Sequence, residues 1–295
     1  MANNNPTLLI TGASGQLGRL IAEFAIGSAP GNVVLATRSP EKVAGLVAKG
    51  AVVRNADFDD PASLEAAFEG IDRVLIVSAS SADTETRLRQ HRAAISAADQ
   101  AGVKFIAYTS APKADDTPLT LAVVHNATEQ AIRETGIPFS FLRNNWYIEN
   151  ETNTILAALA GAPVSTSAGG GRVGWAARRD YAQAAATVIA GSGHENTVYE
   201  LSGPPRTYDE LAAILTEVIG RDVPVQHISD EAYAGVLAGA GLPEFVVQLF
   251  VGVQGAIREG ALDVTSEDLS SLLGRPLTPL SEVIAEIVNA HQAKA

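Results

Sequence analysis

The sequence predicts an α/β protein with a doubly wound parallel sheet and a smaller, mostly helical C-terminal region. Three observations favour this fold class. Short β-branched or aliphatic runs alternate with helix-period segments through the first 150 residues, which is typical of βαβ units. Several of these runs are continuously apolar, as expected for strands that helices cover on both faces. A glycine-rich turn directly follows the first run.

Strands and helices are expected in strict alternation along the first half of the chain. The strands are predicted at 7–11, 33–37, 51–54, 73–78, 103–109 and 138–142. The segments between them carry apolar residues at helical spacing, and helices are expected at 16–26, 40–48, 61–69, 84–101 and 119–135. Strands joined through helices pair in parallel, so the sheet should be mainly parallel.

The second half, 151–295, is Ala-rich and less regular, and it is predicted to form a smaller substrate-binding region after a domain that spans 1–150. A short run near 197–202 is expected to return to the main sheet. Helices are expected at 180–190, 207–219, 230–239, 243–258 and 279–291. Thr207 precedes Tyr-Asp-Glu, which is typical of a helix N-cap. Ligands bind at the carboxyl ends of strands in open α/β sheets, so this half should cover that edge.

The composition excludes several classes of protein. The 21 Lys and Arg residues against 33 Asp and Glu give a net charge of -12, which disfavours a nucleic-acid partner. The chain has no Cys, so it has no disulfide or thiolate metal site, and this suits the reducing cytoplasm. Its five His residues are too scattered for a metal motif. No signal peptide or membrane span is predicted, and the apolar run 245–253 is interpreted as a buried helix or a contact in a homo-oligomer.

A phosphate-binding loop is predicted where the first strand enters the first helix. The spacing Gly-x-x-Gly-x-x-Gly in this context is typical of a Rossmann-like NAD(P)-binding domain. The first glycine permits a tight turn, the second a close approach to phosphate, and the third close helix packing. The amino end of the helix adds unpaired N–H donors. The loop residues predicted to bind the cofactor are Gly12, Ala13, Ser14, Gly15, Gln16 and Leu17.

The residue after the second strand predicts which nicotinamide cofactor is bound. A site for NAD would place an acidic residue about 20 positions after the glycine loop, against the ribose 2′-hydroxyl. This chain has Arg38 there instead. A guanidinium pairs with a 2′-phosphate, so NADP is predicted, with NADPH as hydride donor, and NAD is less favoured. The alternative interpretation is a solvated arginine at a strand end.

Residues at other strand ends are expected to line the cofactor if the sheet is wound as predicted. Asp57 and Phe58 are placed beside the adenine. Small residues after the fourth strand leave room for ribose and phosphate. The predicted lining residues from the fourth and fifth strands are Ser78, Ala79, Ser80, Thr109 and Ser110. Taken singly, a Ser at a strand end is more often only a turn former.

The catalytic pair of ordinary short-chain dehydrogenases is missing. That pair is a Tyr four residues before a Lys on one helical face, where the Lys lowers the pKa of the phenol. None of the six Tyr residues has a Lys at the fourth following position. Alcohol–ketone redox chemistry and sugar-nucleotide epimerisation by that machinery are therefore disfavoured.

The motifs along the chain resemble the NmrA-like, atypical short-chain dehydrogenase group. Within this group the chain is similar to type 2 NAD(P)H:quinone oxidoreductases and to triphenylmethane reductases. The matching motifs cover nearly the whole chain. They are Thr11-Gly-Ala-Ser-Gly-Gln-Leu-Gly18, Ile106-Ala-Tyr-Thr-Ser110, His125-Asn-Ala-Thr-Glu129, Phe141-Leu-Arg-Asn-Asn-Trp-Tyr147 and Leu269-Ser-Ser-Leu-Leu-Gly-Arg-Pro276.

The resemblance implies roles for two segments. His125 and Glu129 take the helical positions that the catalytic Tyr and Lys fill elsewhere. The loop of Arg143, Asn144, Asn145, Trp146, Tyr147 and Ile148 is implied to lie between the nicotinamide and the substrate, with Arg143, Asn144 and Asn145 at the cofactor. The chain departs from the group at Gln130, where some members carry Lys, and at Asn145, where Gly often stands and where a side chain would narrow the pocket.

The predicted function is NADPH-dependent reduction of quinones or related planar electrophiles such as triarylmethane dyes. These acceptors take hydride readily, so the enzyme must chiefly hold donor and acceptor carbons about 3–3.5 Å apart. His125 and Tyr147 are candidate catalytic proton donors beside water, and Trp146 and Tyr147 are candidate aromatic walls for the acceptor. The alternative interpretations are that His125 is a structural residue and that Trp146 and Tyr147 contribute only hydrophobic packing. The alternative function is a dinucleotide-sensing regulator without turnover.

Overall fold

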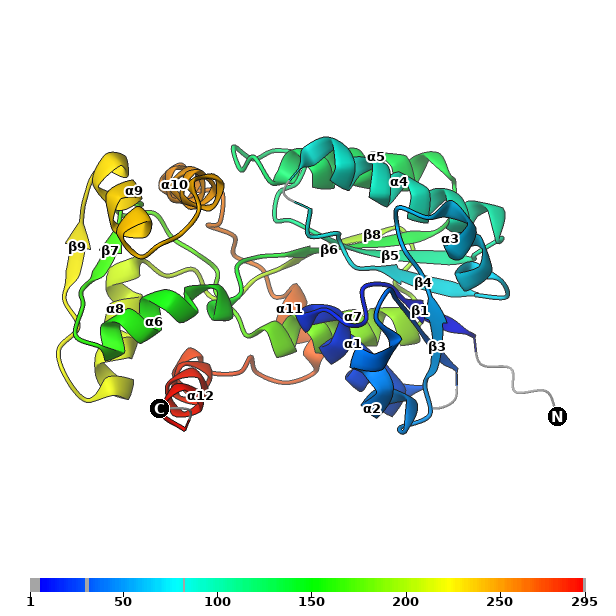
Figure 1. Ribbon diagram of the computed structural model, residues 1–295, viewed down its shortest axis with the longest axis horizontal. Coiled ribbons are helices and arrows are strands. Elements are labelled where there is room, and N and C mark those ends of the chain that lie inside the picture. Colours follow the sequence, from blue (N-terminus) through cyan, green and yellow to red (C-terminus); the bar gives the residue numbers. More distant parts are fainter. Residues whose placement is uncertain (1–5, 30–31, 82, 294–295) are drawn as a thin grey trace.

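The computed structural model describes residues 6–29, 32–81 and 83–293. Figure 1 shows an elongated molecule with two lobes, a larger one that contains the main sheet and a smaller one built mostly of helices. This arrangement confirms the predicted α/β fold class with a doubly wound parallel sheet and a helical C-terminal region.

The main sheet has seven strands, all parallel, in the order β3-β2-β1-β4-β5-β6-β8. The strand order reverses between β1 and β4, which is where such sheets bind ligands. The strands are β1 (Leu8–Ile10), β2 (Val33–Thr37), β3 (Val52–Asn55), β4 (Arg73–Ile76), β5 (Phe105–Ser110), β6 (Phe139–Asn144) and β8 (Thr197–Leu201).

Burial along the strands follows their place in the sheet. Every residue of β1, β2, β5 and β6 is buried, whereas the edge strand β3 has exposed ends and a half-buried middle. Continuous apolar runs therefore mark the central strands because helices cover both of their faces.

Two helical layers enclose the sheet (Figure 1). Helices α3 (Pro61–Phe68), α4 (Thr84–Gln100) and α5 (Ala122–Glu134) share one hydrophobic cluster with one face of the sheet. On the other face, α1 (Gln16–Ser28) packs against α7 (Arg178–Ala190), which packs in turn against α11 (Asp268–Leu273). The predicted helix at 40–48 is instead a 3-10 turn, η1 (Pro40–Val43), followed by the short α2 (Ala44–Val47).

Segments from both halves of the chain build the larger lobe. Strand β8 pairs with β6 at the edge of the main sheet, and α7 and α11 complete the core below it. The second half of the chain therefore does not lie wholly in the smaller lobe, because β8, α7 and α11 belong to the lobe that contains the main sheet.

The smaller lobe has its own hydrophobic cluster. Its elements are η2 (Ile148–Glu151), α6 (Thr152–Leu159), β7 (Val164–Thr166), α8 (Tyr208–Ile219), β9 (Val225–His227), α9 (Asp230–Gly239), α10 (Glu244–Arg258) and α12 (Leu280–Gln292). Thr207 caps α8 as predicted, in a capping box with Glu210. Strands β7 and β9 were not predicted, because three residues each are too few to give a period-two pattern. No helix in the described part of the chain is long and apolar enough to cross a membrane.

Candidate cofactor-binding site

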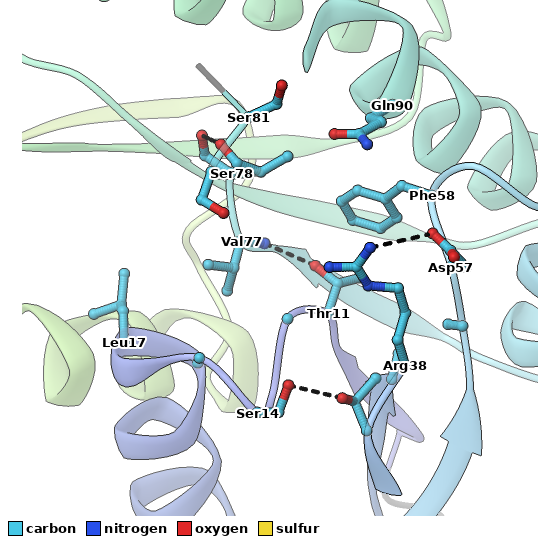
Figure 2. Close-up of a pocket in the computed structure, with 18 of the residues that line it drawn as sticks. Thr11, Ser14, Leu17, Arg38, Asp57, Phe58, Val77, Ser78, Ser81 and Gln90 are labelled. Carbon is cyan, nitrogen blue, oxygen red and sulfur yellow. Dashed lines mark hydrogen bonds and ion pairs between the residues drawn. The ribbon is translucent and has the colours of Figure 1, made fainter. Parts of the chain in front are cut away.

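A cavity of about 520 Å³ opens at the carboxyl ends of strands β1, β2 and β4. Figure 2 shows its lining, with the glycine turn on one side and the segments after β3 and β4 on the other. The predicted cofactor residues that line it are Gly12, Ser14, Gly15, Gln16, Leu17, Arg38, Asp57, Phe58, Ser78, Ala79 and Ser80. The cavity is also lined by Thr11, Gly18, Thr37, Val77, Ser81 and Gln90, among others. Gly18 was predicted only to let the helix pack closely, and Val77, Ser81 and Gln90 were missed because they carry no motif signal of their own.

The glycine turn is shaped by two steric requirements. Gly12 has a φ of +60°, which is the left-handed region that favours glycine. A Cβ added at Gly18 would lie 2.3 Å from the carbonyl oxygen of Gly12, so only glycine lets helix α1 pack on the turn. Ala13 does not line the cavity, because its side chain is fully buried and its N–H donates to Ala36.

The amino end of α1 is an anion-binding position. The helix begins at Gln16 after Gly15, which offers no side-chain cap, and its first turn contains no acidic residue. The first N–H groups of a helix have no partner within it, and the helix dipole adds partial positive charge there. The chain therefore offers unpaired donors and a close backbone approach at this end of the cavity, and these features fit a diphosphate.

Further donors gather beside the end of β2. Ser14 Oγ accepts a hydrogen bond of 2.8 Å from Thr37, so the Ser14 hydroxyl hydrogen remains available to the cavity. Arg38 is largely exposed, and its Nη1 lies 3.9 Å from Asp57 Oδ1, a weak pairing that leaves most of its donors free. Figure 2 shows the Arg38 guanidinium beside Phe58, with Gln90 beyond the ring. A 2′-phosphate and an adenine ring fit this set of side chains.

Two predicted lining residues at the end of β5 instead support the site from behind. Thr109 Oγ1 accepts a hydrogen bond of 2.9 Å from the Ser78 N–H. Ser110 donates a bond of 2.6 Å to Glu129 on helix α5. Both are buried and neither is part of the cavity lining.

Glu129 and Arg143 form a buried two-point ion pair. Arg143 Nε lies 3.0 Å from Glu129 Oε1, and Arg143 Nη2 lies 2.7 Å from Oε2. Arg143 Nη1 also donates to Asp115 at 2.8 Å and to Glu200 at 3.0 Å. Burial acts to lower the pKa of Arg143, but the hydrogen bonds that it donates to Glu129 and Asp115 outweigh burial and raise that pKa. Arg143 therefore joins β6 to α5 and β8.

His125 lies one helical turn before Glu129 and is 7% exposed. Its Nε2 lies 3.0 Å from Arg87 Nη2, and its Nδ1 lies 2.9 Å from the Tyr108 hydroxyl. Burial first, then the charge of Arg87, lowers the pKa of His125 well below its ordinary value. The side chain is therefore neutral, and protein groups engage both of its nitrogens.

The loop after β6 joins the two lobes. Asn145 is buried, and its side chain bonds Ser202, the Leu262 carbonyl and the Trp146 N–H, so it fastens the loop to the C-terminal region. The Asn144 amide donates to the Tyr147 hydroxyl at 3.1 Å, and Asn144 Oδ1 is buried without a partner. Trp146 packs half-buried against the core of the smaller lobe.

Tyr147 lies in aromatic and cationic surroundings. Its ring meets Tyr181 edge to face at 5.1 Å, and the Arg178 guanidinium lies 5.2 Å from its centroid. Burial raises the pKa of Tyr147. Its hydroxyl is therefore protonated at neutral pH and has a hydrogen to donate. Among the residues that the structure describes, no three His, Asp or Glu side chains are grouped to hold a metal ion.

Comparisons with known proteins agree with this geometry. A family model described as NAD(P)H-binding matches residues 12–191. The chain belongs to this NAD(P)H-binding family. Quinone oxidoreductase 2 of Escherichia coli is 40% identical over 286 residues, which cover 96% of this chain and 99% of that protein. The predicted resemblance to the NmrA-like, atypical short-chain dehydrogenases is confirmed.

Two solved structures of the family are similar over nearly all of the chain. Triphenylmethane reductase from Citrobacter sp. in complex with NADP(H) has a TM-score of 0.91 and 39% identity, covering 95% of this chain and 99% of that one. The NADPH-dependent quinone oxidoreductase of Escherichia coli in complex with NADPH has a TM-score of 0.90 and 40% identity, at the same coverage.

His125 and Glu129, which the resemblance implies to take the helical positions of a catalytic Tyr and Lys, are both bonded to arginines, Arg87 and Arg143. Sequence reasoning missed Arg87 because it lies in a charged helix, where it reads as a solvated residue.

Proposed function

We propose that this protein is an NADPH-dependent reductase that transfers hydride to quinones or related planar electrophiles, such as triarylmethane dyes, without a Tyr/Lys pair. The observation that carries the proposal is the cavity at the strand-order reversal, where a glycine turn, an uncapped helix end and Arg38 meet. Relatives named as quinone and triphenylmethane reductases, in complexes with NADPH or NADP(H), support it.

The proposed cofactor is NADPH, which supplies the hydride when it is bound. Gly12, Gly15 and the first turn of α1 would hold the diphosphate, because the two glycines have no side chain to obstruct it and the first N–H groups of α1 have no partner within the helix. Arg38 and Ser14 would hold the 2′-phosphate. Asp57 and Phe58 would flank the adenine, and Ser78, Ala79 and Ser80 would lie along the ribose and phosphate.

The proposed chemistry needs little from the protein beyond placement. Trp146 and Tyr147 would offer aromatic faces to a planar acceptor at the junction of the lobes. A reduced quinone must gain a proton, and we propose water or Tyr147 as its source. The hydrogen bonds favour Tyr147 over His125, because both nitrogens of His125 are engaged by Arg87 and Tyr108.

A panel of acceptors tests the proposal. NADPH oxidation is followed at steady state with several quinones and triarylmethane dyes, and NADPH binding is measured separately by calorimetry. Turnover with at least one acceptor is expected. Tight NADPH binding without any turnover would instead favour the dinucleotide-sensing regulator.

We further propose that the enzyme acts on small molecules in the cytoplasm, since the Cys-free chain suits a reducing compartment. A homo-oligomer also stays a prediction. Phe245 and Leu249 on α10 are exposed apolar residues that fit a subunit contact. Light scattering on the purified protein measures the oligomeric state directly.

A further inference from the structure

Three successive backbone N–H groups after strand β4 are each held by a side chain from a different element. The Val77 N–H donates to Thr11 Oγ1, the Ser78 N–H to Thr109 Oγ1, and the Ala79 N–H to His91 Nε2, each at 2.9 Å. Val77, Ser78 and Ala79 line the cofactor cavity and are called the β4 wall below. Figure 2 labels Val77 and Ser78 of this wall. The wall is therefore fixed from the residue after β1, from β5 and from α4, although it is outside the sheet ladder.

Arg87 supports the same wall through a side chain. Its Nη2 lies 2.6 Å from Ser78 Oγ and 3.0 Å from His125 Nε2. Among the described residues, no carboxylate lies within ion-pair distance of this guanidinium, and its Nε is buried without a partner. Burial lowers the pKa of Arg87. Arg87 is thus a partly buried cation without a carboxylate partner, and it lies directly behind the cavity.

The donors and acceptors fix the proton positions behind the wall. An arginine only donates, so His125 Nε2 accepts from Arg87 and the ring hydrogen is on Nδ1, toward Tyr108. His91 Nε2 accepts from Ala79, so its hydrogen is on Nδ1, 2.8 Å from Thr128 Oγ1. Both imidazoles are neutral, and their hydrogen bonds connect helix α4, helix α5 and the β4 wall.

The strand order shows which part of a dinucleotide the wall would meet. Arg38 follows β2, the glycine turn follows β1, and Ser78 follows β4, on the opposite side of β1 from Arg38. With the 2′-phosphate at Arg38 and the diphosphate at the turn, the nicotinamide riboside would extend past β4. Ser78 Oγ accepts from Arg87 at 2.6 Å and donates to the Ala79 carbonyl at 3.5 Å, so the cation holds this side chain within the wall.

We propose that Arg87 and His91 are positioning residues that hold the β4 wall for the nicotinamide half of NADPH, with His125 bracing Arg87. The inference rests on the proposed function and adds residues that the cavity lining does not contain. His125, which the resemblance implies to take the helical position of a catalytic Tyr, thus supports the β4 wall through Arg87.

The experiment compares the whole cofactor with a fragment that lacks the nicotinamide riboside. Arg87→Gln is titrated by calorimetry with NADPH and with adenosine 2′,5′-bisphosphate. The dissociation constant of NADPH is expected to rise about tenfold or more, since a hydrogen bond to a charged group is lost. The constant of the fragment is expected to stay within about twofold, which also shows that the variant is folded.

Arg92→Gln is the matched control, because Arg92 is exposed on the same helix and the charge change is identical. Neither ligand should be affected by it. Equal losses for NADPH and the fragment in Arg87→Gln, including loss of all binding, would overturn the inference.

A second pair of variants tests His91 independently. His91→Gln keeps an acceptor for the Ala79 N–H and should retain NADPH binding, whereas His91→Leu should weaken NADPH and spare the fragment. Unchanged NADPH binding in His91→Leu would contradict the role of His91. If wild-type protein bound the fragment but not NADPH, the proposed function itself would fail. If the wild-type protein turned over normally and the variants lost affinity equally for NADPH and the fragment, only this inference would be contradicted.

Discussion

Glu129 on α5 and Arg143 at the end of β6 face each other through two parallel hydrogen bonds of 3.0 and 2.7 Å. One helical turn earlier, His125 accepts a bond from Arg87. His125 and Glu129, which the resemblance implies to take the helical positions of a catalytic Tyr and Lys, are therefore both hydrogen-bonded to arginines. They hold strand ends in place, and hydride chemistry with reactive acceptors does not require more of them.

Removing one partner of the buried Arg143–Glu129 pair should lower the free energy of unfolding more than replacing both partners. Arg143→Met leaves Glu129 buried and uncompensated, and a loss of about 3–5 kcal/mol in unfolding free energy is expected. Adding Glu129→Gln should recover part of that loss. Urea unfolding of both variants checks this, and a double variant less stable than Arg143→Met would contradict it.

Gly18→Ala should abolish the close packing of α1 on the glycine turn. The new Cβ would lie 2.3 Å from the Gly12 oxygen, so the helix must move and NADPH affinity should fall. Gly27→Ala on the same helix is the control, since nothing lies within 4 Å of its Cβ position. That control should gain about 0.5–1 kcal/mol in unfolding free energy. Thermal unfolding and calorimetry measure both effects.

Arg38→Asp should change cofactor preference. Loss of a charged hydrogen bond to the 2′-phosphate should weaken NADPH binding by about 10- to 100-fold, while NADH binding changes little. Lys49→Asp makes the same charge change at an exposed residue outside the cavity and should spare both cofactors. Equal losses for NADPH and NADH in Arg38→Asp would show that Arg38 does not contact the 2′-phosphate.

Tyr147→Phe should separate two kinds of acceptor. Hydride addition to a quinone leaves an oxyanion that needs a proton, whereas addition to a cationic triarylmethane dye gives a neutral product. If Tyr147 donates the proton, kcat with quinones should fall by about 10²-fold while kcat with dyes is kept. Tyr199→Phe, whose hydroxyl contacts His194 on an edge segment, is the control. An unchanged kcat with quinones would assign Tyr147 to packing alone, because Phe keeps the ring, and a parallel fall for dyes would contradict the role of proton donor. His125→Asn is measured in the same way.

Protein stability should depend on pH through His91. Burial first, and then the charge of Arg87, lowers its pKa to about 3 in the folded protein. The unfolded chain takes up a proton on this side chain below about pH 6.5, which the folded protein does not accept until about pH 3. Stability is therefore full above pH 6.5 and is lost as the pH falls toward 3. The contribution of His91 should be about 2 kcal/mol smaller at pH 5 than at pH 7.5. The free energy of unfolding is measured with urea for wild type and His91→Gln at both pH values. An equal change in that free energy between the two pH values in both proteins would contradict the prediction.

Local patterns predicted most strands and helices of the larger lobe. Apolar runs marked β2 and β5 well because their residues are buried on both faces. The pair β7 and β9 was missed, since its stability comes from pairing across about sixty residues of chain. The cavity lining was predicted at strand ends, but the supporting Arg87 and His91 were not, because their partners lie on other elements.

The amino-acid sequence by itself determined the parallel sheet, the glycine turn and the cation after β2, because these follow from periodicity, steric limits and the residue at a fixed distance from the turn. The tertiary structure alone decided which side chains meet. Arg87 and His125 are 38 positions apart, and only the packing of α4 on α5 brings them to 3.0 Å. Hydrogen bonds are short-ranged and directional, so chain order gives no sign of such partners before the helices are in place.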